Sequence, residues 1–225
     1  MSKPLRIFLI RHGQSAGNED VSLYNSVPDF AMPLTEKGKQ QAQEAGQKLR
    51  AEGPGRFFFY ISSYRRTRET FEGIAEAFNR EDFEFREDPR IIEQSWVGSL
   101  PAGGFDRQAE KDREAYSSFY YRFTTGESNV EVYTRVSSFL DTLHRDFEKE
   151  DYPENVGIIC HGMTLRVFLM RWFHWTVEEF EAIRNPQNCA IIELALGPDG
   201  RYQLVTDLPK YPKSTHNHQY PLKIK

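Results

Sequence analysis

Two histidines share a local context that points to anion chemistry. His12 lies in the run Ile-Arg-His-Gly at positions 10–13, and His161 lies in Cys-His-Gly at positions 160–162. In an open parallel sheet, ligands bind beyond the carboxyl ends of the strands, where helix N-termini direct free backbone N–H groups outward. Either histidine alone is explained better as a core residue. Two in the same context predict that both meet at one anion.

Arginines and an asparagine near these turns could bind the oxygens of such an anion. Arg11 precedes His12, and residues 65–68 contain three arginines at the start of a helix expected after a β-prone run. Guanidinium groups bind two phosphate oxygens at once, and positive charge in the first turn of a helix opposes its dipole. Asn18, six residues after His12, could donate one more hydrogen bond, and a plain turn residue explains it equally well.

Hydrophobic periodicity predicts the elements that position these residues. Predicted strands cover residues 5–10, 57–61, 156–160, 188–196 and 202–205, and predicted helices cover 35–51, 67–78 and 130–147. Thr35 is the expected N-cap of the first helix. Because strands and helices alternate, we expect an α/β fold, a three-layer α/β/α sandwich with a mostly parallel central sheet.

One long stretch does not follow this alternation. Residues 94–125 contain several glycines and then a cluster of aromatic residues, and they are too long for an ordinary connection. We interpret them as a small cap inserted into a domain that spans residues 1–208. Residues 209–225 are basic and contain three prolines, which favours an extended or loosely docked C-terminal tail.

Composition and charge exclude several classes of protein. The 225 residues are 39% hydrophobic and 28% charged, which argues against disorder and allows one large core. The net charge of −4 lacks the basic excess that nucleic-acid or anionic-membrane partners require. Two cysteines do not make a disulfide scaffold, and the apolar run 7–10 is too short for a signal peptide or a membrane span. We therefore expect a cytoplasmic protein, with its oligomeric state left open.

The ordered set of motifs resembles the histidine phosphatase, or phosphoglycerate mutase-like, superfamily. The resemblance is carried by Arg-His-Gly-Gln-Ser at 11–15 with Asn18, a variant of Ser-Pro-x-x-Arg-Ala-x-Gln-Thr at 62–70, Glu93, and His-Gly at 161–162. Gly-Glu-Ser at 126–128 and the run 164–173 are similar to plant and fungal phosphoglycerate mutase-like proteins, a group that includes fungal broad-range acid phosphatases. The resemblance covers most of the chain.

That resemblance implies phosphomonoester hydrolysis through a phosphohistidine on His12. It assigns Arg11, Arg66 and His161 to the phosphate oxygens, and Glu93 to proton donation to the leaving group. Asn18, Gly162 and Arg65 are further candidates for phosphate binding, Arg65 because the block 62–70 has two adjacent arginines where the family has one. The resemblance implies neither a metal nor a cofactor, and the expected partner is a small phosphorylated substrate.

The same roles imply definite protonation states. His12 must be neutral to attack phosphorus, His161 is expected to stay cationic, and Glu93 must be protonated when the leaving group departs. For this reason the pKa of Glu93 is expected to rise through burial or a neighbouring carboxylate. A bell-shaped pH profile weighted to the acid side follows.

Three other readings remain open from the sequence. The phosphoryl group could return to the substrate, as in a mutase, although Gln-Ser-Trp-Val-Gly at 94–98 differs from the Arg-His-Tyr-Gly of true phosphoglycerate mutases. The chain could be a phospho-ligand binding module without activity. Finally, Cys160 and Arg166 have the spacing of cysteine-dependent phosphatases, but Gly162 and Val167 depart from the pattern of that family. A cysteine in a buried strand is also usually inert.

The physiological substrate is not readable from the sequence. Residues 105–122 of the expected cap carry four basic and four acidic side chains, which makes no basic funnel for a polyphosphorylated ligand. Small or aromatic phosphate esters are favoured, with Tyr120, Tyr121 and Phe123 as possible contacts.

Overall fold

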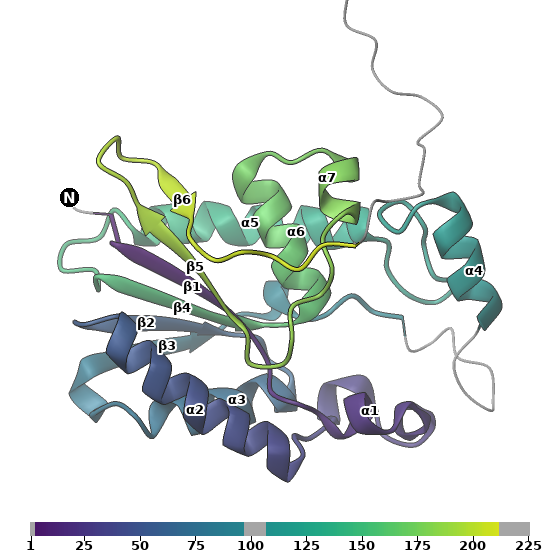
Figure 1. Ribbon diagram of the computed structural model, residues 1–225, viewed down its shortest axis with the longest axis horizontal. Coiled ribbons are helices and arrows are strands. Elements are labelled where there is room, and N and C mark those ends of the chain that lie inside the picture. The colour runs from purple at the N-terminus through teal and green to yellow at the C-terminus, as the bar shows by residue number, and fades with distance from the viewer. Residues whose placement is uncertain (1–2, 97–106, 212–225) are drawn as a thin grey trace, which may run out of the picture.

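A six-stranded sheet lies at the centre of the protein, in the order β3-β2-β4-β1-β5-β6 (Figure 1). The computed structural model describes residues 3–96 and 107–211. The strands are β1 (Arg6–Arg11), β2 (Phe57–Ile61), β3 (Phe83–Glu87), β4 (Asn155–Cys160), β5 (Ile191–Leu196) and β6 (Tyr202–Leu204). The pairs β1–β4, β4–β2 and β2–β3 are parallel, whereas β5 and β6 join in antiparallel orientation. The four parallel strands therefore end at one edge of the sheet.

Helices cover both faces of this sheet. The α-helices are α1 (Ala16–Glu19), α2 (Glu36–Glu52), α3 (Arg65–Ala75), α4 (Arg107–Tyr116), α5 (Asn129–Asp146), α6 (Gly162–Phe173) and α7 (Val177–Glu181). Figure 1 shows α2 and α3 on one face and α5, α6 and α7 on the other, while α1 and α4 lie beyond the carboxyl ends of the strands. This arrangement confirms the predicted three-layer α/β/α sandwich with a mostly parallel sheet.

The core has two parts, one on each side of the sheet. Ile7 and Leu9 of β1 pack with α5 and α6, whereas Phe8 and Ile10 pack with α2 and α3. Alternate side chains of a strand point to opposite faces, so a strand buried on both faces must be apolar at every position. The uninterrupted apolar run of β1 follows from its place in the middle of the sheet.

The structure differs from the sequence prediction at several elements. The expected strand 188–196 begins only at Ile191, because residues 187–190 form a turn in which Cys189 has a φ of 54°. The edge strand β3 was not predicted, since its five residues Phe-Glu-Phe-Arg-Glu mix apolar and charged side chains. Within the expected cap, α4 is helical and residues 97–106 lie outside the described part. Of the expected tail, residues 209–211 pair with 182–184, and residues 212–225 lie outside the described part.

Close backbone contact fixes the turn that follows β1. A Cβ atom on Gly13 would lie 2.5 Å from the carbonyl oxygen of Gly38, and a Cβ on Gly38 would lie 2.1 Å from that of Gln14. Because the N-terminus of α2 packs directly against this turn, only glycine fits at both places. Among the described residues, no helix is both long and apolar enough to cross a bilayer.

Candidate active site

Three residues that directly follow neighbouring parallel strands meet at the carboxyl edge of the sheet. His12 follows β1, His161 follows β4 and Ser62 follows β2. The centroids of the two imidazole rings are 5.2 Å apart, and the two histidines are 4% and 0% exposed. The predicted convergence of two distant His-Gly turns is present in the structure.

The ring of His12 is held in one tautomer. Its Nδ1 lies 2.7 Å from the backbone oxygen of Gly13. Because a carbonyl oxygen only accepts, Nδ1 carries the proton and Nε2 keeps its lone pair. Burial, together with the charges of Arg66 and Arg11, lowers the pKa of His12 well below its usual value. His12 is thus a neutral imidazole with one nitrogen able to act as a nucleophile.

His161 is equally buried, but it makes its hydrogen bond through Nε2, whereas His12 uses Nδ1. Its Nε2 lies 2.7 Å from the Ser62 hydroxyl oxygen, whereas its buried Nδ1 has no hydrogen-bond partner among the described residues. Burial first, and then the charge of Arg66, lowers the pKa of His161 well below its usual value. The expectation that His161 stays cationic is therefore wrong for this structure, because the buried imidazole faces arginines rather than a carboxylate.

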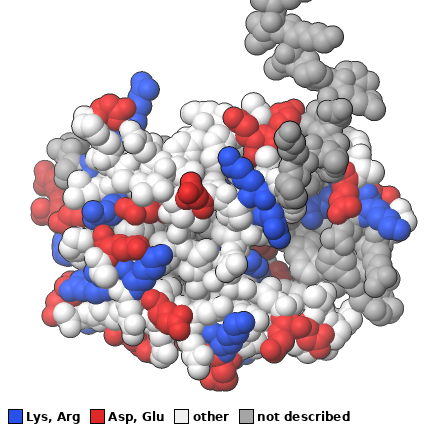
Figure 2. All heavy atoms as spheres, viewed as in Figure 1, with Lys and Arg blue, Asp and Glu red and all other residues white. Residues whose placement is uncertain are grey.

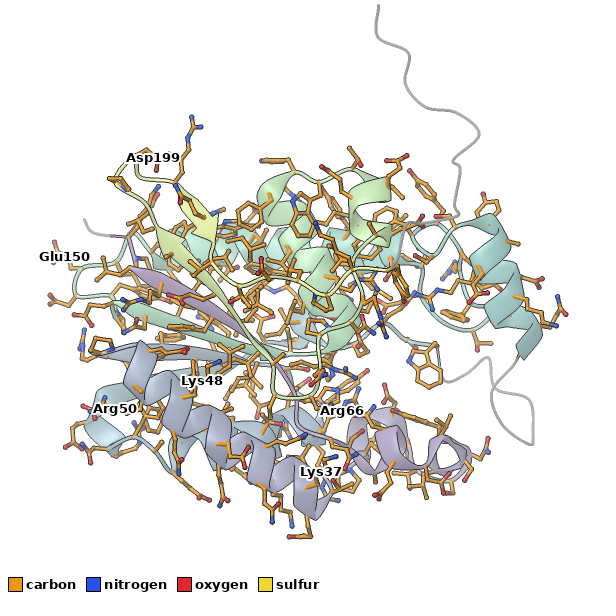
Figure 3. The ribbon with its side chains drawn as sticks, viewed as in Figure 1. Lys37, Lys48, Arg50, Arg66, Glu150 and Asp199 are labelled. Carbon is orange, nitrogen blue, oxygen red and sulfur yellow. The ribbon has the colours of Figure 1, made fainter. Side chains whose placement is uncertain are left out.

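Arg66 extends from the first turn of α3 to this cluster. Its side chain is 2% exposed, and Nη1 donates to the backbone oxygen of Asp29 (2.7 Å) and to the Asp29 carboxylate (2.8 Å). The guanidinium carbon lies 4.9 Å from the ring centroid of Tyr64, and the buried Nε has no partner among the described residues. Figure 3 shows Arg66 at the end of the sheet opposite Glu150 and Asp199.

Arg65, the neighbouring candidate, lies outside the cluster. Its side chain is 56% exposed, and its Nε donates to the carboxylate of Glu69 one helical turn later, at 2.6 Å. The helix therefore directs one of the two adjacent arginines inward and the other toward solvent.

Arg11 and Asn18 complete the polar lining near His12. Nη1 of Arg11 donates to the backbone oxygen of Pro186 at 2.6 Å, and its buried Nε has no partner among the described residues. The side-chain oxygen of Asn18 accepts from the backbone N–H of Ser15 (3.2 Å) and from the side-chain amide of Asn188 (3.1 Å). These two bonds orient the amide of Asn18 so that its Nδ2 remains available as a donor.

Glu93 is held at the N-terminus of α6. Its carboxylate accepts from the backbone N–H groups of Gln94 (3.0 Å), Met163 (3.2 Å) and Thr164 (3.2 Å). The N-terminal turn of a helix favours a negative charge. His161 is the N-cap of the same helix, and the N–H of Gly162 makes no hydrogen bond within the described residues. One helix start thus positions the carboxylate, an imidazole and a free amide.

The segment after Glu93 is tied to the start of α5. The carboxylate of Glu127 accepts from the backbone N–H of Ser95 (3.0 Å) and from both Nε and Nη2 of Arg135 (3.1 and 3.2 Å). The Glu127 N–H donates to the Ser95 oxygen at 2.8 Å. The Gly-Glu-Ser motif at 126–128 therefore acts as an anchor for the chain that carries Glu93.

The cysteine alternative does not fit this geometry. Cys160 lies in β4 within the core cluster, and burial raises the pKa of its thiol far above the usual value. The guanidinium of Arg166 is directed to the backbone oxygen of Phe180 (3.0 Å) and to the side chain of Asn185 (3.3 Å). A buried, protonated thiol is a poor nucleophile. Among the described residues, no three His, Cys, Asp or Glu side chains come together as metal ligands.

Comparison with known proteins places this geometry in a family. Residues 7–207 match the model of the histidine phosphatase superfamily, branch 1. The chain belongs to the histidine phosphatase superfamily. This histidine phosphatase is 42% identical over 216 residues to the phosphoglycerate mutase-like protein AT74H of Arabidopsis thaliana, with 88% of this chain and 76% of that protein covered.

More distant relatives support the same placement. The broad-range acid phosphatase DET1 of Saccharomyces cerevisiae is 28% identical over 305 residues, covering 93% of this chain and 91% of that protein. A solved structure of a mycobacterial glucosyl-3-phosphoglycerate phosphatase covers 93% of this chain and 100% of its own, with a TM-score of 0.69 and 21% identity. That structural likeness concerns the fold.

Sequence reasoning gave no role to Ser62, Asp29 or Tyr64. The position of Ser62 could have been predicted, because it directly follows a third predicted parallel strand. Residues in that place lie at the same edge of the sheet as the two histidines. The Tyr64 ring lies 5.2 Å from that of His161, measured between centroids. Asp29, in the short 3₁₀ helix η2 (Asp29–Ala31), has no motif around it, and only the folded chain brings it to Arg66.

Proposed function

We propose that this histidine phosphatase hydrolyses phosphomonoesters through a covalent phosphohistidine on His12. The observation that carries the proposal is the buried, neutral imidazole whose Nδ1 proton is fixed on the Gly13 oxygen, with its Nε2 lone pair free. Attack on phosphorus needs this lone pair, and a low pKa keeps it available on the acid side of neutrality.

In the first step, Nε2 of His12 forms a bond to phosphorus as the ester P–O bond breaks. Charge on the phosphoryl oxygens is balanced by the guanidinium groups of Arg11 and Arg66, each of which has a buried Nε without a partner among the described residues. Further donors are the Asn18 amide, the Gly162 N–H and Nδ1 of His161. Where the Ser62 hydroxyl donates to Nε2, the proton of neutral His161 lies on Nδ1, ready to bind phosphate.

Glu93 transfers the proton in both steps. As a carboxylic acid it protonates the departing alkoxide, and the resulting carboxylate then takes a proton from the water that attacks the phosphohistidine. That second attack releases inorganic phosphate and restores neutral His12 and protonated Glu93. The hydrogen bonds from the start of α6 keep the carboxyl in place through the cycle.

Hydrolysis is proposed over mutase activity for two reasons. The residues after Glu93 differ from those of phosphoglycerate mutases, and one relative aligned over 93% of this chain is an acid phosphatase by name. A non-catalytic binding module would have no use for a His12 ring fixed in the tautomer that keeps the Nε2 lone pair free. We further propose a cytoplasmic location, consistent with the free thiols of Cys160 and Cys189.

The proposal is tested by phosphate release from 4-nitrophenyl phosphate in the presence of a chelator. Wild type is expected to release phosphate, and His12→Asn, which keeps a donor to the Gly13 oxygen, is expected to lose at least about a thousandfold in rate. Equal rates for the two proteins would refute His12 as the nucleophile. Isomerisation of a phosphoglycerate without phosphate release would show a mutase instead.

A further inference from the structure

Five arginines around the carboxyl edge of the sheet form ion pairs with carboxylates. The pairs are Arg65–Glu69 (2.6 Å), Arg66–Asp29 (2.8 Å), Arg68–Glu87 (2.6 Å), Arg90–Asp88 (2.6 Å) and Arg135–Glu127 (3.1 Å). Arg11 and Arg166 differ, because they donate to the backbone oxygens of Pro186 and Phe180, respectively. Figure 2 likewise shows basic and acidic side chains interspersed on the face displayed.

Of these pairs, Arg66–Asp29 is the one in the candidate active site. The Asp29 carboxylate and backbone oxygen both accept from Nη1, so they hold one corner of the guanidinium. Nε and Nη2 of Arg66 make no hydrogen bond with the described residues, and these two N–H groups form the side-on edge that binds two phosphate oxygens. Asp29 leaves that edge free while bringing a negative charge next to it.

We propose that Asp29 is a specificity-determining residue, whose carboxylate makes the site favour phosphate esters that carry no second anionic group. This inference rests on the proposed phosphatase function. It defines the substrate class as phosphate monoesters whose alcohol part carries no charged group.

The charge count of the site gives the physical reason. Two guanidinium groups, Arg11 and Arg66, face the Asp29 carboxylate, while Glu93 is protonated before the first step and the buried imidazoles of His12 and His161 are neutral. The phosphoryl group and the Asp29 carboxylate together therefore balance the charges of these two guanidinium groups. A further phosphate or carboxylate on the substrate would add to the negative charge of Asp29, and like charges in a partly dehydrated site repel strongly.

Asp29 itself is largely buried, at 11% side-chain exposure. Burial raises the pKa of its carboxyl, and the adjacent Arg66 guanidinium opposes that rise. The ion pair with Arg66 favours the charged form, and assays at pH 7 and above favour it further. The Tyr64 ring, which packs against the Arg66 guanidinium, contributes no charge at that pH, because burial raises its pKa to about 12.

The test compares phenyl phosphate with 4-carboxyphenyl phosphate, two aryl esters that differ by one carboxylate. For each protein we take the ratio of kcat/KM on phenyl phosphate to that on the carboxylated ester, so that leaving-group effects cancel between proteins. Asp29→Asn keeps an oxygen for Arg66 Nη1 but removes the charge. Its ratio is expected to fall about tenfold below that of wild type, because the repulsion between the Asp29 carboxylate and that of the ester is lost.

Two further variants separate charge from position. Asp29→Ala also removes the side-chain acceptor of Arg66, so it is expected to raise KM for both esters more than Asp29→Asn does. Asp82→Asn is the matched control, since Asp82 pairs with Arg50 at 3.1 Å, and Figure 3 shows Arg50 on the part of α2 remote from Arg66. Its ratio is expected to equal that of wild type.

The outcomes separate the inference from the proposed function. An Asp29→Asn ratio equal to that of wild type, with both esters hydrolysed, overturns the role of Asp29 and leaves the phosphatase intact. Absence of phosphate release from both esters by wild type overturns the phosphatase assignment and the inference together. A lowered ratio in Asp82→Asn as well would show a general effect of surface charge, which also contradicts the inference.

Discussion

The two buried imidazoles make the stability of this protein depend on pH in a defined direction. His12 and His161 are neutral in the folded protein, because burial and nearby guanidinium groups lower the pKa of each well below its usual value. In the unfolded chain each titrates near pH 6.5. Below that pH the unfolded state therefore binds more protons than the folded state, and the free energy of unfolding falls as the solution is acidified.

The size of the effect follows from the same linkage. A histidine that stays neutral in the folded protein lowers the free energy of unfolding by RT ln(1 + 10^(6.5 − pH)). This amount grows from about 0.2 kcal/mol at pH 7 to about 2.1 kcal/mol at pH 5. Each of the two histidines thus removes up to about 1.9 kcal/mol of stability over this interval. That is a large share of the roughly 5–15 kcal/mol typical of a folded domain.

Urea unfolding at pH 7 and pH 5 measures this loss. His12→Asn and His161→Gln keep hydrogen-bonding atoms near the Gly13 oxygen and the Ser62 hydroxyl, respectively. Between pH 7 and pH 5 the free energy of unfolding of wild type is expected to fall further than that of either variant, by up to about 1.9 kcal/mol. His174→Gln, at the exposed C-cap of α6, is the control outside the site. Equal losses in wild type and both site variants would refute the neutral buried pair.

Other substitutions test the roles of single residues. Arg66→Ala is expected to lower kcat/KM about 10²–10³-fold, as removal of an oxyanion donor does, whereas Arg65→Ala should retain most of its activity; the reverse order would show that the wrong arginine is assigned. Ser62→Ala is expected to lower kcat/KM about tenfold and Ser62→Thr to restore it, because the hydroxyl orients a buried imidazole; wild-type kinetics in Ser62→Ala would remove that role. Glu93→Gln is expected to slow phenyl phosphate more than 4-nitrophenyl phosphate, whose leaving group needs less protonation, and an equal effect on both would argue against proton donation.

Much of the site was predictable because of a topological rule. Apolar runs before His12 and His161 indicate central strands, and residues that follow parallel strands meet at one edge of the sheet. The rule extends to Ser62 after β2, although a serine alone carries less chemical signal than a histidine. Local pattern was weakest at β3, an edge strand in which only Phe83 is buried, and at the turn 187–190 before β5.

Other features depend on contacts that no local pattern contains. The charge state of His161 was predicted incorrectly, since it depends on burial and on Arg66 rather than on the residue type. The pairing of Asp29 with Arg66 joins η2 to α3 across 37 positions, and neither residue predicts the other. Helix geometry explains why Arg66 is buried and Arg65 is exposed, but the direction of that helix is set by its packing on the sheet.

Protein-bound phosphate on His12 is the most direct test of the proposed chemistry. Wild type is mixed with a labelled aryl phosphate, quenched in base within the first turnover, digested and analysed by mass spectrometry. We predict a base-stable, acid-labile phosphoryl group on the peptide that contains His12, present also in Cys160→Ser and absent in His12→Asn. Turnover without any protein-bound phosphate, or a phosphoryl group on a different residue, would contradict the account.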